Sequence, residues 1–198
     1  MTDDLWRVTT EVESVNGVRE VPLITSELMN RKIFIFGDIT SDTADMFLLQ
    51  MMCLQCQSNE PIDIYIDSNG GEVDAGLAIY DMITSSTVTI RTHCIGKAYS
   101  MGAVIFAAAD KGNRDMLRHS KVMIHEPLIG NGISGSATTI KNISDTILEV
   151  KRTISEILAK HTGKDIEEVE RAISFDNYMN AEESISFGIC DSILEKIA

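Results

Sequence analysis

The sequence lacks any apolar run of the roughly 20 residues that a membrane-spanning helix needs. The apolar stretch at 101–109 is too short for that purpose and predicts a buried helix. There is also no basic N-terminal flank followed by an apolar run, the pattern of a secretion signal. The four cysteines, Cys53, Cys56, Cys94 and Cys190, lie in apolar or strand-like contexts. We therefore expect a protein of the reducing cytoplasm.

Basic residues are scarce relative to acidic ones. Lys and Arg number 17 against 30 Asp and Glu, which gives a formal net charge of -13 and a pI near 4.6. A surface of this sign repels phosphate backbones and anionic lipid, so neither nucleic acid nor a membrane is an expected partner.

No segment fits the ATP-binding pattern G-x-x-x-x-G-K-[ST]. Neither Gly96-Lys97 nor Gly163-Lys164 has the required upstream glycine and following hydroxyl. If folded proteins are the substrates, a separate ATPase must unfold them, and we expect this chain to need no cofactor and no metal.

Strand and helix signals alternate from residue 32 onward. A chain of 198 residues fits one domain, which at this size buries about 70% of the surface of its unfolded chain. The alternation predicts an α/β domain with a largely parallel sheet. Residues 1–21 are polar, and Asn16-Gly17 is a turn signal, so this end is expected to be a hairpin or a mobile arm. Strands are expected at 33–36, 62–67, 87–95 and 121–125, and helices at 42–56, 73–83 and 101–109.

A long helix is predicted from about residue 138 to residue 160. Its aliphatic residues recur at alternating spacings of three and four, which is typical of a narrow coiled-coil-like seam and predicts contact with another helix or subunit. Short helices are expected after Asp165 and at 181–187, and a last strand near 189–193. The seam consists of Ile140, Ile143, Ile147, Val150, Ile154 and Ile157.

Four sites have the residue types that an activated serine requires: a nucleophile, a base, an acid to orient the base, and backbone donors for an oxyanion. Ser100 lies between a predicted strand and a predicted helix, beside unpaired backbone donors. His125 closes an apolar strand, at a strand end where ligands collect in α/β sheets. Asp176 lies in a loop between two short helices. Gly70-Gly71 follows a strand and leaves its amides unobstructed.

Each of these residues also has an ordinary structural interpretation. Ser100 could be only a helix N-cap, His125 a structural histidine, Asp176 a turn residue and Gly70-Gly71 a plain turn.

The other three histidines are less suitable candidates for the general base because of their positions in the sequence. His93 lies inside a strand pattern and His119 in a polar turn. His161 lies at a helix C-terminus, where its charge would interact favourably with the helix dipole.

Two further motifs are better explained by structural roles than by binding or catalysis. Gly130 to Gly135 matches G-x-G-x-x-G, but it is separated from the preceding strand, so a flexible loop is favoured over a dinucleotide site. Cys53-x-x-Cys56 lies on an amphipathic helix without a second cysteine pair or a close histidine, so ordinary packing is favoured over zinc or redox chemistry.

Four linked segments resemble, in order and spacing, those of ClpP-type serine peptidases. The resemblance runs from about Ser26 to the end of the chain. The segments are Ser68-Asn69-Gly70-Gly71 with Ala75 to Asp81, Gly96 to Ala103, Met123-Ile124-His125-Glu126-Pro127-Leu128, and the C-terminal residues His161-Thr162-Gly163, Glu170-Arg171 and Asp176 to Glu183.

Residue by residue, this resemblance implies Ser100 as nucleophile, His125 as general base and Asp176 as the residue that orients the histidine. The amides of Gly71 and Met101 would form the oxyanion hole, and Tyr65 matches an aromatic position in the family's docking cleft for its unfoldase.

The resemblance also implies an architecture, the α/β ClpP/crotonase fold of repeated βα units with a protruding handle. Residues 1–25 would be an N-terminal axial segment, and residues 26–198 a single peptidase domain. Its handle, at about 126–160, would combine the long helix with a strand from the glycine-rich loop, along which extended peptides lie.

The implied assembly is a pair of stacked heptameric rings that enclose a proteolytic chamber. An AAA+ unfoldase such as ClpX, ClpA or ClpC would feed it with polypeptides and would use the ATP itself. The implied activity is serine endopeptidase hydrolysis of unfolded proteins and peptides.

The chain departs from the family pattern at three places. Asn69 stands where proline is usual, Tyr99 where a small residue is usual, and Ser174-Phe175 where the family has an acid–arginine pair that helps to lock ring to ring. One alternative is therefore a latent ClpP paralogue, active only in a mixed ring with a second ClpP subunit. Another is a crotonase-like acyl-CoA enzyme, which shares the fold and the oxyanion device.

Overall fold

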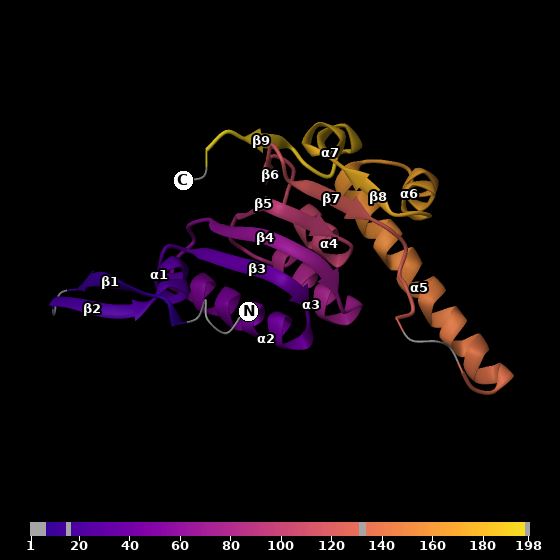
Figure 1. The fold of residues 1–198 in the computed structure, drawn as a ribbon, viewed down its shortest axis with the longest axis horizontal. Coiled ribbons are helices and arrows are strands. Elements are labelled where there is room, and N and C mark those ends of the chain that lie inside the picture. The colour runs from indigo at the N-terminus through magenta and orange to yellow at the C-terminus, as the bar shows by residue number, and fades with distance from the viewer. Residues whose placement is uncertain (1–6, 15–16, 131–133, 197–198) are drawn as a thin grey trace.

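The N-terminal part of the chain forms a β-hairpin outside the central sheet. The computed structural model describes residues 7–14, 17–130 and 134–196. Within them, β1 (Thr9–Ser14) pairs antiparallel with β2 (Gly17–Pro22), and α1 (Leu23–Met29) leads into the sheet. The hairpin projects from one end of the molecule (Figure 1). Of the two expectations for this end, the structure shows the hairpin, although Asn16 of the predicted turn lies outside the described residues.

The central sheet is largely parallel, as the alternation of signals predicts. Five strands lie side by side in the order β3, β4, β5, β6, β9, and all neighbours are parallel. The shorter β7 pairs parallel with the end of β5, and β8 pairs antiparallel with β7. The strands are β3 (Lys32–Ile39), β4 (Ile62–Gly71), β5 (Ile90–Tyr99), β6 (Arg114–Leu117), β7 (Lys121–Ile124), β8 (Asn177–Met179) and β9 (Ser192–Leu194).

Helices cover one face of this sheet and form the core with it. They are α2 (Ser41–Gln57), α3 (Val73–Thr84) and α4 (Met101–Ala107), of which α2 and α3 run along one side in Figure 1. Alternate residues of β3 and β4 point into this layer because successive strand side chains face opposite sides. They are all isoleucines, no more than 1% exposed, whose branched side chains suit a pleated, buried surface: Ile33, Ile35, Ile62, Ile64 and Ile66.

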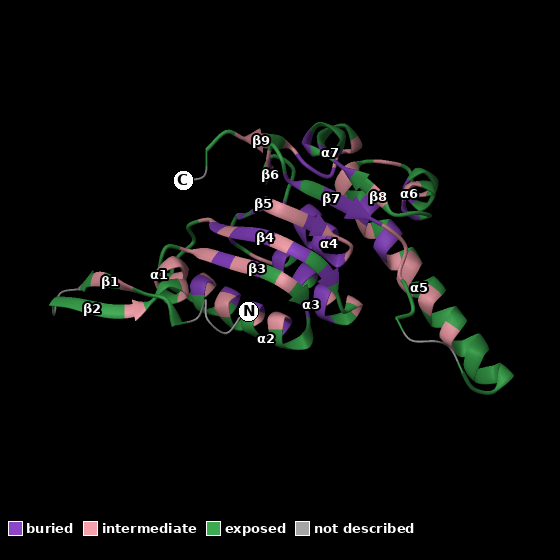
Figure 2. Cartoon of the chain, in the orientation of Figure 1, coloured by how far each residue is buried: buried purple, intermediate pink, exposed green. Residues whose placement is uncertain are grey.

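The long helix α5 (Ala137–Thr162) extends away from this body (Figure 1). It begins at Ser136, whose side chain accepts a hydrogen bond from the amide of Thr139, and ends at the left-handed Gly163. Only the part near the body is buried, and the protruding part is mostly exposed (Figure 2). The aliphatic seam follows this division, since Ile154 is 5% exposed and Ile140 43%. The protruding half of the seam is therefore only partly covered within the described chain, where Ile143 and Ile147 line a hollow with Pro127 and Leu128.

Two short helices complete the C-terminal part, α6 (Ile166–Ile173) and α7 (Ala181–Phe187). The predicted capping of α7 is present, because the Asn180 and Glu183 side chains each accept a hydrogen bond from the other residue's amide.

Some elements were not expected from the sequence. These are α1, β6 and β8, and the last strand, β9, begins at Ser192 rather than near residue 189. β6 has no apolar alternation because it contains Arg114, which is only 2% exposed. Its guanidinium is nevertheless satisfied: it donates to Asp191 at 2.6 Å and to the carbonyl of His161 at 2.8 Å. A buried charge of this kind is tolerated only with such partners.

Within the described residues, no helix combines the length and the apolar character needed to cross a membrane.

Candidate active site

Ser100 occupies the sharp turn between β5 and α4. Its backbone has φ 55° and ψ −121°, an unusual conformation for a residue with a side chain. The turn is held by the Ser100 amide, which donates to the carbonyl of Met123 at 2.8 Å, and by the Ser100 carbonyl, which accepts from Ala103. Ser100 is the N-cap residue of α4, but its hydroxyl makes no capping hydrogen bond. The hydroxyl is therefore free for another partner.

The end of β4 approaches this turn very closely, and glycine is what permits the approach. A Cβ atom on Gly70 would lie 2.7 Å from the Ser100 Cβ and from the Tyr99 carbonyl oxygen. A Cβ on Gly71 would lie 2.1 Å from the Ile39 carbonyl oxygen. Both distances are far inside van der Waals contact, so the pair is more than a plain turn. Gly70 brings the β4 backbone up to the serine, and Gly71 brings it up to β3.

His125 directly follows β7, the strand that pairs with the end of β5. Its Nε2 lies 2.8 Å from the Ser100 hydroxyl oxygen, and its side chain is 15% exposed. The next residue anchors the segment in two ways. The Glu126 amide donates to the Ile173 carbonyl at 2.7 Å, and the Glu126 carboxylate pairs with Lys151 of α5 at 2.6 Å. These anchors were not anticipated, since neither pattern nor spacing relates Glu126 to Lys151.

Asp176 reaches the histidine because β8 pairs with β7. Ile124 lies opposite Asn177 in this antiparallel pair, so the next residue of one strand, His125, meets the preceding residue of the other, Asp176. The Asp176 Oδ1 is 3.2 Å from the His125 Nδ1. Its side chain is 62% exposed, which makes it the most open of the three groups.

The three candidates thus form a chain of contacts from carboxylate to imidazole to hydroxyl. If Nδ1 carries the proton toward Asp176, Nε2 is left as an acceptor for the Ser100 hydroxyl. That arrangement can deprotonate a serine as it attacks a carbonyl carbon.

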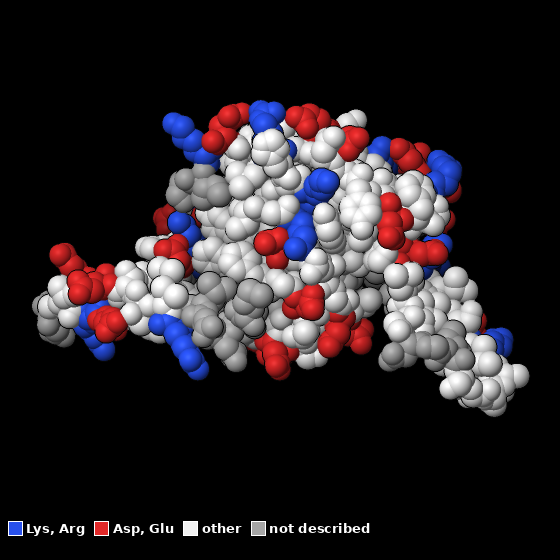
Figure 3. Space-filling model, in the orientation of Figure 1, with Lys and Arg blue, Asp and Glu red and all other residues white. Residues whose placement is uncertain are grey.

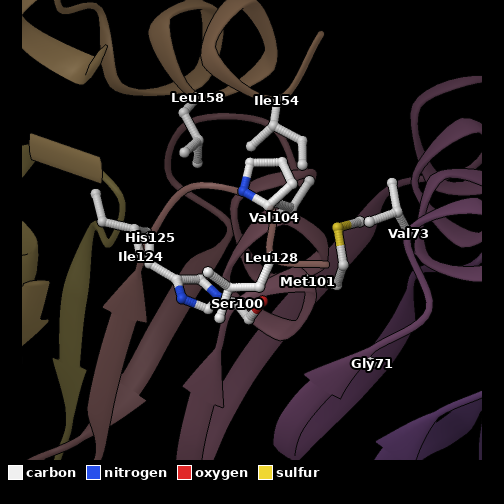
Figure 4. A pocket seen from close by; sticks show the side chains of 11 residues that line it. Gly71, Val73, Ser100, Met101, Val104, Ile124, His125, Leu128, Ile154 and Leu158 are labelled. Carbon is white, nitrogen blue, oxygen red and sulfur yellow. Dashed lines mark hydrogen bonds between the residues drawn. The ribbon is translucent and has the colours of Figure 1, made fainter. Parts of the chain in front are cut away.

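Gly71 and Met101 line the same cavity as Ser100 and His125. Figure 4 shows Ser100 and His125 side by side, with Ile154 and Leu158 of α5 on one side of the cavity. The rest of the lining is mainly apolar: Val73, Val104, Ile124, Pro127 and Leu128. The cavity can therefore take an apolar side chain beside the serine.

The remaining histidines lie away from this cavity. His161 contradicts the expectation of a charge at a helix end, because burial lowers its pKa from 6.5 to about 4. The Nε2 of its ring lies 2.9 Å from the Tyr80 hydroxyl oxygen. His93 is buried beside Asp63, with its Nε2 3.0 Å from that carboxylate. His119 is exposed, as expected for a turn.

Ordinary packing was expected for the Cys53-x-x-Cys56 motif, but the structure places both cysteines on the exposed side of α2. Cys53 and Cys56 are both exposed, because Met51 and Leu54 occupy the buried face of α2 instead. Within the described residues, no group of three or more His, Cys, Asp or Glu is placed to hold a metal ion. Cys94 and Cys190 are buried, and burial raises the pKa of each thiol to about 12.

The structure bears only partly on two further segments, the glycine-rich loop and the surroundings of Tyr65. Residues 131–133 of the loop lie outside the described residues, and the described residues on either side form no strand. Tyr65 is only 7% exposed, since its ring stacks on Phe34 at 5.3 Å between centroids and lies against His93. A partner docking there would meet mainly the residues around Tyr65, such as Phe36, which is 42% exposed.

The face of the molecule in Figure 3 shows no extended basic surface: a small group of basic side chains lies near the middle, beside an acidic one. Acidic side chains gather along the lower edge, and acidic and basic side chains alternate along the upper edge. This distribution agrees with the net charge of -13.

A comparison with protein families adds independent evidence. The model of the Clp protease family matches residues 16–197, which is nearly the whole chain. The match covers all the segments that carry the resemblance, and it includes the hairpin strand β2, where little likeness was expected.

Proposed function

This chain belongs to the Clp protease family, and from that premise we propose that it is a serine endopeptidase with Ser100 as nucleophile, His125 as general base and Asp176 as the orienting acid. Its substrates would be unfolded polypeptides and peptides. The family match favours this reaction over that of a crotonase-like acyl-CoA enzyme.

The observation that carries the proposal is the pair of contacts made by one imidazole. His125 lies 2.8 Å from the Ser100 hydroxyl and 3.2 Å from the Asp176 carboxylate, on opposite ring nitrogens. A base within hydrogen-bond reach of a hydroxyl, itself oriented by a carboxylate, is what nucleophilic serine chemistry requires.

The reaction follows from this geometry. The Ser100 oxygen attacks the scissile carbonyl carbon while His125 takes the hydroxyl proton at Nε2. The protonated imidazole, stabilised by Asp176, then gives that proton to the leaving amine. Water, deprotonated by the same nitrogen, attacks the acyl-serine and releases the second product.

The amides of Gly71 and Met101 would stabilise the oxyanion that forms during both attacks. Both residues line the cavity of Ser100, and Met101 begins α4 immediately after it. Backbone donors placed in advance need no rearrangement when the charge develops, which is why such groups contribute strongly.

A fluorophosphonate probe tests the proposal directly. It should label the wild-type protein and stop cleavage of a short fluorogenic peptide, and labelling should disappear in Ser100→Ala. Ser85→Ala is the matched control, because Ser85 is an exposed residue just after α3 and should leave both results unchanged. A wild-type assembly that neither labels nor cleaves contradicts the proposal.

We further propose that the chain works in stacked heptameric rings served by an AAA+ unfoldase that hydrolyses the ATP. The half-exposed seam on α5 supports this, because a partly covered aliphatic stripe on a protruding helix suits contact with the same helix of another ring. Native mass measurement should give a multiple of seven chains. A monomer that remains active on peptides would contradict the assembly but not the chemistry.

A second candidate, a latent subunit for a mixed ring, has one observation in its favour. Phe175 is 61% exposed and the Ser174 hydroxyl is bonded to its own helix, so the segment before Asp176 offers no ionic lock to a neighbouring ring. Activity that appears only on mixing with a second family member would favour this candidate. Full activity of the chain alone would exclude it.

A further inference from the structure

Two tyrosines next to the candidate residues contact each other across the sheet. Tyr99 immediately precedes Ser100, and Tyr178 follows Asp176 by two positions. Their rings meet edge to face, with centroids 5.4 Å apart and planes at 90°. This is the arrangement that the ring quadrupoles favour.

The strand register places this contact beside the reacting groups. Met123 of β7 lies opposite Tyr99 of β5 on one side and opposite Tyr178 of β8 on the other. The three residues therefore form one row across the sheet. This row lies two residues from His125 along one segment and two residues from Asp176 along the other.

The end of β8 next to Asp176 is the more open end of that strand. β8 contains three residues and, within the described chain, pairs only with β7. Its last residue, Met179, is buried in the core, whereas the Asp176 side chain is 62% exposed and is hydrogen-bonded to His125. A further contact near the open end would hold the carboxylate more firmly in place.

The ring pair can supply that support because its two ends belong to different strands. Tyr99 is attached to the firmly held serine turn and is half-buried. Tyr178 lies in the middle of the short strand β8 and is 54% exposed. Their contact thus connects the serine turn to the strand that directly follows Asp176.

We propose that Tyr99 and Tyr178 are positioning residues that hold β8 so that Asp176 stays within reach of His125. This inference rests on the proposed peptidase function. Neither tyrosine would touch the substrate, so the pair should affect the rate of the chemical step and not substrate binding.

Tyr99→Ala and Tyr178→Ala test the proposal, with Tyr99→Phe and Tyr178→Phe as matched controls that keep the ring. Each alanine variant should lower kcat for a short peptide about three- to tenfold, the size expected for one edge-to-face pair, with KM unchanged within twofold. The phenylalanine variants should stay within twofold of the wild type. The double alanine variant should be no worse than the poorer single one, because both remove the same contact.

The pH profile separates positioning from simple stability. Losing Asp176 as a partner destabilises protonated His125, so the acid limb of the kcat/KM profile should move to lower pH in the alanine variants. A lower melting temperature with an unmoved acid limb and unchanged kcat would overturn the proposal. Should Tyr99→Ala not fold, Tyr178→Ala, at an exposed position, gives the same test.

These outcomes differ from a failure of the peptidase assignment. If the wild type reacts with the probe and Ser100→Ala does not, the function stands whatever the tyrosine variants do. If the wild type itself is inert to probe and peptide, the function falls and the positioning role falls with it.

Discussion

Ser100 lies in a crowded turn, whereas Asp176, at the other end of the same chain of contacts, lies at the surface. The serine is surrounded by the β4 glycines, the Met123 carbonyl and the start of α4. The carboxylate extends from a three-residue strand and is 62% exposed. The comparison teaches that Ser100 is fixed by packing, while the Asp176 carboxylate depends on a few local contacts.

A consequence is that the serine turn can hold a strained backbone conformation, whereas the exposed segment around Asp176 lacks the packing to do so. A residue with φ 55° persists only where its surroundings over-determine it, and Ser100 has such surroundings. The acid side is the part of the site that a neighbouring subunit could best reinforce, because its groups are still open to contact.

The largest expected effect is on the crowded side. Ser100→Ala should lower kcat by roughly 10⁵-fold or more, because no other group can replace the nucleophile. Its stability should change little, since the hydroxyl makes no capping bond. Peptide cleavage and a melting curve measure the two results. A loss of less than about tenfold would show that Ser100 is not the nucleophile.

On the open side, Asp176→Asn should lower kcat by about 10²- to 10³-fold, less than the serine variant. An exposed carboxylate is partly screened by water, so its stabilisation of the imidazolium is smaller than that of a buried one. Peptide kinetics measure this loss. Asp165→Asn, an exposed acid that makes no side-chain cap bond, should leave kcat unchanged. Equal losses in the two variants would remove Asp176 from the site.

The close approach at Gly70 can be tested by stability alone. Gly70→Ala should lower the free energy of unfolding by about 2–4 kcal/mol, because the added Cβ meets Ser100 at 2.7 Å and φ is +90°. Gly112→Ala is the matched control: it has φ +95° but nothing within 4 Å of the added Cβ. Chemical denaturation of both variants isolates the cost of crowding. Equal costs would mean that the turn is not tightly packed.

The smallest expected effect concerns acidic pH and lies away from the site. The pKa of His161 is about 4 in the folded chain against the ordinary 6.5, so the unfolded chain binds the proton more readily. Stability from this group should therefore be intact above pH 6.5 and should fall as the pH drops from 6.5 toward 4. His161→Gln should flatten that part of the stability profile.

The pH dependence of stability in His161→Gln also separates effects at the candidate site from effects on overall stability. Activity lost below pH 6.5 in the wild type includes the loss of stability from His161. Activity that still declines in His161→Gln belongs to the site. An unaltered stability profile in that variant would show that His161 is not the titrating group.

Much of the candidate site can be predicted from the sequence. Ser100 and His125 each stand at the end of an apolar strand, where α/β sheets collect chemistry, and glycines mark the close approach of β4. Helix ends could also be predicted from neighbouring residues, as at Asn180 and Gly163. Such features depend on neighbours within a few residues, so a sequence pattern is enough to predict them.

Other features depended on segments that are distant in the chain. β6 contains a buried arginine whose partner, Asp191, is 77 residues away, so no local pattern could predict that strand. β8 is defined only by its pairing with β7, and Cys53 and Cys56 face outward because of how α2 turns its other side to the sheet.

The sequence by itself determined the residue types, the alternation of strands and helices, and the strand ends at which chemistry could occur. Only the tertiary structure decided that His125 meets a hydroxyl 25 residues away and a carboxylate 51 residues away. The physical reason is that hydrogen bonds require atoms within about 3 Å. Such closeness between distant residues arises from the register of β5, β7 and β8, which pairing across the sheet sets.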